Sequence, residues 1–327
     1  MARLQALLQR VTDVLDRVSE KTETPRGRRT AMAVSAVVFV VAMFLGLKAL
    51  PPGERDLEWW PIIVSSVIGV PVLVVLNGME YMASGTVLGH RISFRDSLPV
   101  AIYARAANLL PIPGAALIRM QALKRQGSSY GRAASATMAV ALYWLGTSLL
   151  VGGVVLVPSH LVLAVLFLAG GLLGCVLGHV AVRGIVARRT DDPPASTVVR
   201  SSASLFAIEA AIIVVRGLRF WLLMVGFDLG GSFAGAMVLP VAGVLASAIG
   251  FFPSGLGIRE LISGGLSRIV GDTAASGVLA SGFDHVVSLP VMAVLTLLVG
   301  LLDRKPDLEL PEPDEPPAAS DDPAGRR

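Results

Sequence analysis

Long apolar runs separated by short polar connections make up most of this chain of 327 residues. Six of the runs approach the roughly 20 residues that a helix needs to cross the hydrocarbon core of a bilayer. They cover residues 31–50, 59–83, 133–157, 160–183, 203–226 and 278–302. The pattern therefore predicts an all-α polytopic membrane protein with about six full transmembrane helices.

Two other apolar stretches, 98–118 and 233–262, are interrupted by Pro and Gly. The positions of Lys and Arg, which favour the cytoplasmic side of membrane proteins, indicate how these stretches run. Basic residues gather in five clusters, at 1–30, 91–95, 119–132, 183–200 and 304–305. If all five clusters are cytoplasmic, each interrupted stretch has to enter and leave the membrane on one side. We therefore expect two re-entrant broken-helix elements, with both termini in the cytoplasm.

The two interrupted stretches are similar in sequence. The first copy reads LPVAIYARAANLLPIPGAALIR (98–119) and the second reads LPVAGVLASAIGFFPSGLGIR (239–259). Both open with Leu-Pro-Val-Ala, place a Pro six residues before an Arg, and close with Ile-Arg. Three full spans separate the copies, and an odd number of spans inverts the second relative to the first. Inverted repeats with broken helices are typical of membrane transporters, whose substrate sites lie where the repeats meet.

The two ends of the chain differ from the apolar domain, which we place at residues 29–303. Residues 1–28 carry leucines and valines at helical spacing, which predicts an amphipathic helix on the cytoplasmic membrane surface or against the protein's own loops. Residues 304–327 are rich in Pro and in acidic residues. Such a composition cannot bury a core, so we expect a disordered cytoplasmic tail.

Composition agrees with a membrane protein and excludes several other classes. Apolar residues make up 54% of the chain and charged residues only 16%, against about 25% in soluble proteins. Outside the acidic segment 303–327, the chain holds 24 basic and 16 acidic residues, a net charge of +8. The single cysteine, Cys175, excludes a disulfide framework. The sequence has no nucleotide-binding loop and no metal-ligand spacing, so we expect no cofactor, no metal and no nucleic-acid partner.

The tips of the two interrupted stretches carry the first candidate chemistry. They read NLLPIPGAALIRM and FFPSGLGIRELI. In each tip Pro and Gly break the helix, so the next helix begins with free backbone N–H groups and carries an Arg close behind, Arg119 or Arg259. Helix N-termini together with Arg favour a phosphate or another anion. The alternative is a tight helix–helix contact, with Arg119 as an anchor at the cytoplasmic surface.

Ionisable residues inside the apolar stretches form the second candidate group. They are Glu80, Arg105, Glu209, Arg216, Arg219, Asp284 and His285. A charged group at this depth costs at least about 2.5 kcal/mol, so it usually faces a partner or a wet cavity. We expect Asp284 to pair with Arg216 or Arg219. The alternative is that these residues are interhelical ion pairs that only hold the bundle together.

At these motifs the chain resembles the membrane domain of the lysylphosphatidylglycerol synthase/flippase family. The resemblance covers about residues 30–302 and rests on NLLPIPGAALIRMQALKRQGSSYGRA and on FFPSGLGIRELI, which is similar to the family's Pro-x-Gly-x-Gly-x-x-Glu stretch. It implies that the matching positions are functional: Asn108, Pro111, Gly114, Arg119, Pro253, Gly255, Gly257 and Glu260. In bifunctional members this domain moves an aminoacylated phospholipid from the inner to the outer leaflet. The chain ends at Arg327, and we expect a stand-alone member without the aminoacyl-transferase domain.

These observations predict a lipid translocase of the bacterial plasma membrane, of the flippase or scramblase kind, rather than an enzyme. Its partner would be a membrane phospholipid with an anionic or aminoacylated head group, and a homo-oligomer and a separately encoded lipid-modifying enzyme stay open. Two alternatives are a membrane enzyme that resembles polyprenyl-pyrophosphate phosphatases and a non-transporting scaffold. The substrate-binding residues we expect are Arg105, Asn108, Gly114, Arg119, Glu209, Arg216, Arg219, Gly255, Gly257, Arg259, Glu260 and Asp284.

Overall fold

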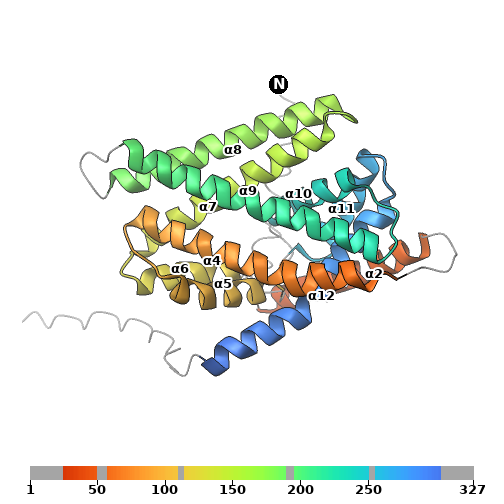
Figure 1. Ribbon diagram of the computed structural model, residues 1–327, viewed down its shortest axis with the longest axis horizontal. Coiled ribbons are helices and arrows are strands. Elements are labelled where there is room, and N and C mark those ends of the chain that lie inside the picture. The colour runs from red at the N-terminus through yellow and green to blue at the C-terminus, as the bar shows by residue number, and fades with distance from the viewer. Residues whose placement is uncertain (1–24, 50–56, 110–113, 189–194, 250–254, 303–327) are drawn as a thin grey trace, which may run out of the picture.

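The computed structural model describes residues 25–49, 57–109, 114–188, 195–249 and 255–302, and in these ranges all regular structure is helical (Figure 1). The helices are α2 (Pro25–Ala49), α3 (Trp59–Ile63), the π-helical turn η1 (Val64–Ile68), α4 (Gly69–Leu88), α5 (Phe94–Leu109), α6 (Gly114–Arg125), α7 (Tyr130–Leu156), α8 (Leu161–Ala187), α9 (Ala195–Gly226), α10 (Phe233–Ile249), α11 (Ile258–Ile269) and α12 (Ala274–Leu302). The predicted amphipathic helix up to residue 24 and the predicted tail from residue 304 lie outside the described residues.

Five helical segments in the described residues are long and apolar enough to cross a membrane. They are Trp59–Leu88, Tyr130–Leu156, Leu161–Ala187, Ala195–Gly226 and Ala274–Leu302. Each contains one of the spans predicted from the sequence, apart from differences of a few residues at the ends. The remaining predicted span, 31–50, is helical within α2 as far as Ala49, and its described side chains, Val37–Ala49, form a shorter apolar helix. The protein is therefore an all-α polytopic membrane protein, as the hydrophobic pattern predicts.

Each interrupted stretch forms a pair of short helices that pack against each other. The pair α5 and α6 is separated by residues 110–113, and the pair α10 and α11 by residues 250–257. At the open end of the first pair, His90 Nε2 lies 2.8 Å from Ser128 Oγ, so the chain enters and leaves this pair at one place. At the open end of the second pair, the Ser232 N–H donates to Asp272 Oδ2 over 2.9 Å. Each pair is thus a hairpin that returns to the end of the bundle from which it started.

The two hairpins open toward opposite ends of the helix bundle. The N–H of Glu58, just before α3, donates to the carbonyl of Gly226, where α9 ends and the second hairpin follows. The segment Trp59–Leu88 then runs to the other end, where the first hairpin begins. The two hairpins consequently enter the bundle from its opposite ends, which is the inverted arrangement that the sequence repeat predicts.

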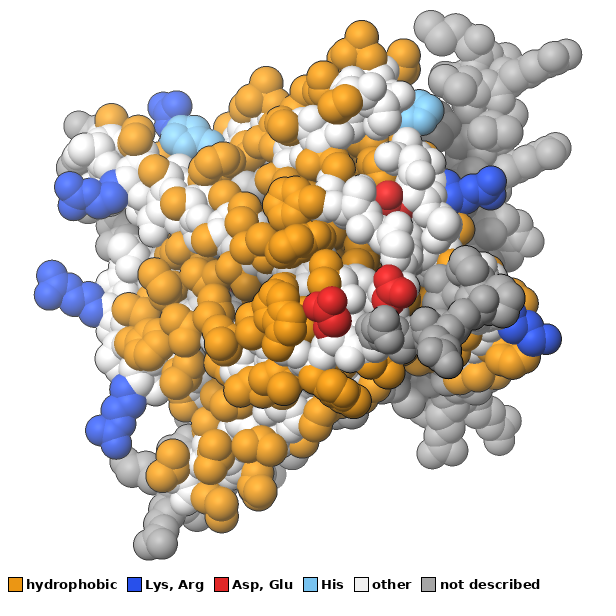
Figure 2. All heavy atoms as spheres, turned by 45° about the vertical axis from the view of Figure 1, so that its right-hand side comes forward, with side chains coloured by type: hydrophobic (Ala, Val, Ile, Leu, Met, Phe, Trp, Pro, Cys, Tyr) orange, Lys and Arg blue, Asp and Glu red, His pale blue; other side chains and the backbone are white. Residues whose placement is uncertain are grey.

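Exposed charge differs strongly between the two ends of the bundle. We call the end where the first hairpin opens the basic end. Among the side chains whose burial the structure describes, eight basic ones are exposed there: Arg91, Arg95, Lys124, Arg125, Arg132, Arg183, Arg188 and Arg200. Two exposed basic side chains, Lys48 and Arg268, belong to described segments at the opposite end. Between the ends, hydrophobic side chains cover much of the visible surface, and several Lys and Arg side chains protrude at the left (Figure 2). Such a surface suits contact with lipid around the middle of the molecule.

Helices α7 and α8 pack closely because glycines face the contact. A Cβ added to Gly146 on α7 would lie 2.6 Å from Cys175 Sγ and 2.9 Å from the carbonyl oxygen of Gly171 on α8. Small residues at membrane helix contacts let two backbones approach in this way. The outer face of α8 carries exposed apolar side chains such as Val162 and Leu172, so this helix lies at the edge of the bundle (Figure 1).

Candidate functional site

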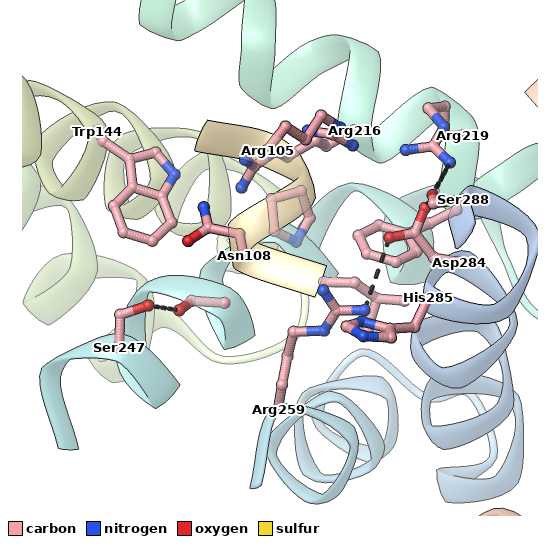
Figure 3. A pocket seen from close by; sticks show the side chains of 14 residues that line it. Arg105, Asn108, Trp144, Arg216, Arg219, Ser247, Arg259, Asp284, His285 and Ser288 are labelled. Carbon is pink, nitrogen blue, oxygen red and sulfur yellow. Dashed lines mark hydrogen bonds and ion pairs between the residues drawn. The ribbon is translucent and has the colours of Figure 1, made fainter. Parts of the chain in front are cut away.

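A cavity of about 150 Å³ lies between the two hairpins (Figure 3). Its lining residues come from six helices: Arg105 and Asn108 of α5, Trp144 of α7, Arg216, Arg219 and Phe220 of α9, Leu239, Pro240, Gly243 and Ser247 of α10, Arg259 of α11, and Asp284, His285 and Ser288 of α12. The first residue of α5 lies near the open end of the hairpin. Arg105 is the twelfth residue of this helix, so it lies about 17 Å along the axis from that end. Because the hairpins enter from opposite ends, the cavity lies deep within the bundle.

The guanidinium of Arg219 is bonded to residues of two other helical segments. Its Nη2 lies 2.9 Å from Asp284 Oδ1 and donates to Ser288 Oγ, also over 2.9 Å. Its Nε donates to the carbonyl oxygen of Ser65 over 2.9 Å, and only 2% of the residue is exposed. Ser65 lies in the π-helical turn of Val64–Ile68, and such turns are frequent at functional sites. Arg219 therefore ties α9 to α12 and to this turn.

Arg259 reaches the same carboxylate from the second hairpin. Its Nη2 lies 3.6 Å from Asp284 Oδ2, so Asp284 lies between Arg219 and Arg259 (Figure 3). The guanidinium also donates to Ser281, from Nε to the hydroxyl over 3.0 Å and from Nη2 to the carbonyl over 2.7 Å. About 20% of the side chain stays exposed, so part of the guanidinium remains open toward the cavity.

The backbone just before Arg259 has a conformation that requires glycine. Gly255 and Gly257 have φ values of +68° and +84°, in the left-handed region that other residues rarely adopt. The N–H of Gly257 donates to Glu260 Oε2 over 2.6 Å, and the Glu260 side chain is fully buried. Gly255, Gly257 and Glu260, expected from the sequence to bind substrate, instead shape the start of α11 and are not among the residues that line the cavity.

Arg105 and Arg216 are the arginines of the cavity that carry no carboxylate partner among the described residues. The Arg216 guanidinium lies 5.7 Å from the centre of the Trp144 ring, a cation–π distance. The Nε of Arg105 is buried and has no hydrogen-bond partner within the described residues. Figure 3 shows both side chains along the same wall of the cavity.

Arg119 and Glu209 lie outside the cavity lining, contrary to the expectation that both contact the substrate there. Arg119 forms a bidentate ion pair with Glu80: Nη1 contacts Oε1, and Nη2 donates to Oε2 over 3.2 Å. Its Nη2 also donates to Asn77 Oδ1 over 2.9 Å. Arg119 is therefore neither a surface anchor nor a residue of the cavity lining, because its guanidinium forms an ion pair with the buried carboxylate of Glu80.

The cavity contains half of the twelve expected binding residues: Arg105, Asn108, Arg216, Arg219, Arg259 and Asp284. The predicted pairing of Asp284 with Arg216 or Arg219 is confirmed, with Arg219 as the partner at 2.9 Å. Gly114 begins α6 directly after residues 110–113, and the expected Pro111 and Pro253 lie outside the described residues. Among the described residues, no group of three or more His, Cys, Asp or Glu side chains could hold a metal ion.

Sequence reasoning missed Trp144, Ser247 and Ser288 as lining residues. One signal for Ser288 was present in the last span. Ser281, Asp284 and Ser288 recur at intervals of three and four residues, which places polar groups along one face of a helix. A polar stripe in an otherwise apolar span marks the face that turns away from lipid.

A family model described as the lysylphosphatidylglycerol synthase TM region matches residues 30–295. A comparison with curated proteins finds no match. The family match covers both hairpins, four of the five spans completely and residues 274–295 of the fifth, α12. The chain therefore belongs to the lysylphosphatidylglycerol synthase transmembrane-region family, which indicates a function related to membrane lipids.

Proposed function

We propose that this protein is a lipid translocase of the bacterial plasma membrane, which moves a phospholipid or lipid-linked head group between the leaflets. The observation that carries the proposal is the cavity between the two hairpins, which is lined by four arginines and one carboxylate. The two hairpins would re-enter the bilayer from opposite sides, and the cavity would then lie at the depth that a head group has to cross.

The charge of the cavity favours an anionic group. The four guanidinium groups, the carboxylate of Asp284 and the carboxylate of Glu260, whose Oε1 lies 3.5 Å from Arg259 Nε, sum to +2. Uncompensated charge is expensive inside a membrane, so a bound phosphate would relieve a cost that the empty cavity carries. Arg also binds phosphate with paired N–H donors, which gives geometry as well as attraction. Arg105 and Arg216, which carry no carboxylate partner among the described residues, are the groups we assign to the phosphate.

The exposed charge gives the orientation that we propose. Lys and Arg are enriched on the cytoplasmic side of membrane proteins. The basic end would therefore face the cytoplasm, and the second hairpin, with Arg259 near its tip, would open to the outside. A head group would pass along the polar side chains of the cavity while its acyl chains stay in the bilayer.

The experiment is a transport assay with purified protein in liposomes that contain fluorescent phosphatidylglycerol or fluorescent phosphatidylcholine. A membrane-impermeant reductant quenches the outer leaflet, and the fraction that becomes quenched later reports movement between leaflets. We expect faster movement of phosphatidylglycerol than in protein-free liposomes. Rates equal to those of protein-free liposomes for all head groups would contradict the proposal. Release of phosphate from a prenyl pyrophosphate by the same preparation would favour the enzyme alternative.

A further inference from the structure

A second group of ionisable residues lies between the cavity and the basic end. It consists of the buried residues Glu80 of α4 and Glu209 of α9 and of Arg119 of α6, whose side chain is 22% exposed, and we call it the acid cluster. Glu80 is eight residues before the end of α4, about 12 Å from the basic end along the helix axis. Glu209 interacts electrostatically with both other members. The mechanism of head-group binding described above does not use this cluster.

Glu209 has the least compensated charge of the acid cluster. Only 2% of Glu209 is exposed, and within the described residues no hydrogen bond or ion pair reaches its carboxylate. Both terminal nitrogens of Arg119 donate to Glu80, and Nη2 also donates to Asn77. A buried carboxylate without a direct cationic partner is strongly unfavourable in its charged form. The acid cluster thus has two carboxyl groups but one directly bonded arginine.

The next cation along α9 is Arg216, which connects the acid cluster to the cavity. It lies seven residues after Glu209, about 10 Å along the axis. It interacts electrostatically with Glu209 and with Glu80, and it also lines the cavity. When a phosphate in the cavity engages Arg216, the acid cluster loses part of the positive field that stabilises two carboxylates.

The other elements that pack against α9 offer Glu209 no further cation. On α8, His179 Nδ1 lies 2.9 Å from Ser202 Oγ, about two turns away along α9. Helix α10 contains no titratable residue. On α12, Asp284 pairs with Arg219, and on α7 the nearest titratable side chain to this region is the neutral Tyr143. The charges that act on Glu209 are therefore those of Glu80, Arg119 and Arg216.

From this arrangement we infer that Glu209 is a proton-binding site that is coupled to the anion in the cavity. Binding of an anionic head group to Arg216 removes positive charge from the acid cluster, and Glu209 then takes up one proton from water and becomes a neutral carboxyl. Release of the head group returns Arg216 to the cluster, and the proton leaves. This inference rests on the proposed function, and it makes a proton the ion whose movement accompanies the lipid.

The first test needs no lipid. Infrared difference spectra of the purified protein between acidic and alkaline buffer should contain the carbonyl band of a titrating carboxyl, and Glu209→Gln should remove that band. Glu80→Gln should also remove it, because Arg119 is then free to pair with Glu209. A band that persists unchanged in Glu209→Gln would overturn the inference. The spectrum of the wild-type protein is a test by itself. If it contains no band from a titrating carboxyl group, the inference is overturned.

The second test measures the coupling. Short-chain phosphatidylglycerol is titrated into wild-type protein in a weakly buffered solution with a pH indicator, and short-chain phosphatidylcholine serves as the comparison. We expect uptake of up to about one proton for each phosphatidylglycerol bound, and an affinity that rises by up to about tenfold for each unit by which the pH falls. Glu209→Gln, which imitates the protonated state, should bind without proton uptake and should keep high affinity in alkaline buffer. His179→Gln should behave as the wild type.

The outcomes separate the inference from the proposed function. Binding of phosphatidylglycerol without proton uptake would overturn the coupling and leave the translocase proposal intact. Uptake that persists in Glu209→Gln would assign the proton to another group, such as His285 in the cavity, and would also overturn it. If no phospholipid binds, the proposed function and the coupling both fail, while the infrared band still decides whether Glu209 binds a proton.

Discussion

The guanidinium of Arg219 lies 2.9 Å from the carboxylate of Asp284, and the other oxygen of that carboxylate faces Arg259 at 3.6 Å. One acid, whose side chain is 15% exposed, therefore holds together an arginine of the long span α9 and an arginine at the start of α11 in the second hairpin. This arrangement makes Asp284 both a structural contact and the residue that limits the positive charge of the cavity.

Replacing Asp284 by Asn should destabilise the protein and increase its response to anions. Removal of one partner from a buried ion pair costs about 3–5 kcal/mol, because the remaining charge stays buried. The melting temperature in detergent should fall, and short-chain phosphatidylglycerol should raise it more than in the wild type, since the phosphate replaces the lost charge. Asp228→Asn, at an exposed carboxylate after α9 whose backbone conformation Asn also adopts, is the control and should melt as the wild type. A variant Asp284→Asn with wild-type stability would show that the pair is not needed.

The contact between α7 and α8 should be intolerant of a single added methyl group at Gly146. The new Cβ would meet backbone and Sγ atoms of Cys175 within 3 Å, so the two helices have to move apart. We expect Gly146→Ala to lower the free energy of unfolding by about 1–3 kcal/mol. Gly184→Ala, on α8 with no atom within 4 Å of the added Cβ, should be neutral or stabilising by up to about 1 kcal/mol. Equal melting temperatures for the two variants would contradict the packing.

Glu260 should matter for the shape of the second hairpin tip. Its carboxylate accepts the N–H of Gly257, so Glu260→Ala leaves a buried backbone donor without its partner. The expected loss of stability is about 1–3 kcal/mol, together with slower lipid transport because Arg259 follows directly. Leu261→Ala on the same helix removes an exposed apolar side chain and should affect neither. If Glu260→Ala is destabilised but transports lipid at the wild-type rate, the hydrogen bond between Gly257 and Glu260 is not needed for transport.

The bond that closes the second hairpin can be measured as a pairwise energy. The Asp272 carboxylate accepts both the N–H and the hydroxyl of Ser232, over 2.9 and 3.0 Å. Ser232→Ala, Asp272→Ala and the double variant form a thermodynamic cycle. We expect a coupling of about 0.5–3 kcal/mol. Additive effects of the two single variants would mean that the ends of the hairpin are held by packing alone.

Much of this architecture could be predicted from the sequence. The apolar runs have the length of membrane spans, and the breaks between the paired short helices fall in the predicted tips, whereas Pro99 and Pro240 lie inside α5 and α10. That Asp284 pairs with Arg216 or Arg219 followed from the cost of leaving a charge alone in a span, and the structure shows Arg219 as the partner. These predictions succeed because they depend on local composition and on the properties of the surrounding lipid, and not on the detailed packing of the helices.

The division of the charges into two groups could not be predicted. Arg119 and Arg259 occupy equivalent places in the repeat, which suggested equivalent roles. Their neighbours break this equivalence, because the first hairpin packs beside Glu80 of α4 and the second beside Asp284 of α12. Which carboxylate an arginine meets is decided by how distant helices pack, and a repeat within the sequence carries no information on that point.

The most direct test of the central claim compares two arginines of helix α11 in the liposome transport assay. Arg259 lines the cavity and Arg268 is exposed in the last turn of the same helix, so Arg259→Gln and Arg268→Gln remove the same charge from different places. Loss of a charged hydrogen bond to a phosphate should slow phosphatidylglycerol movement by about tenfold or more in Arg259→Gln. Arg268→Gln should transport at the wild-type rate. Equal rates for both variants and the wild type would contradict transport through this cavity.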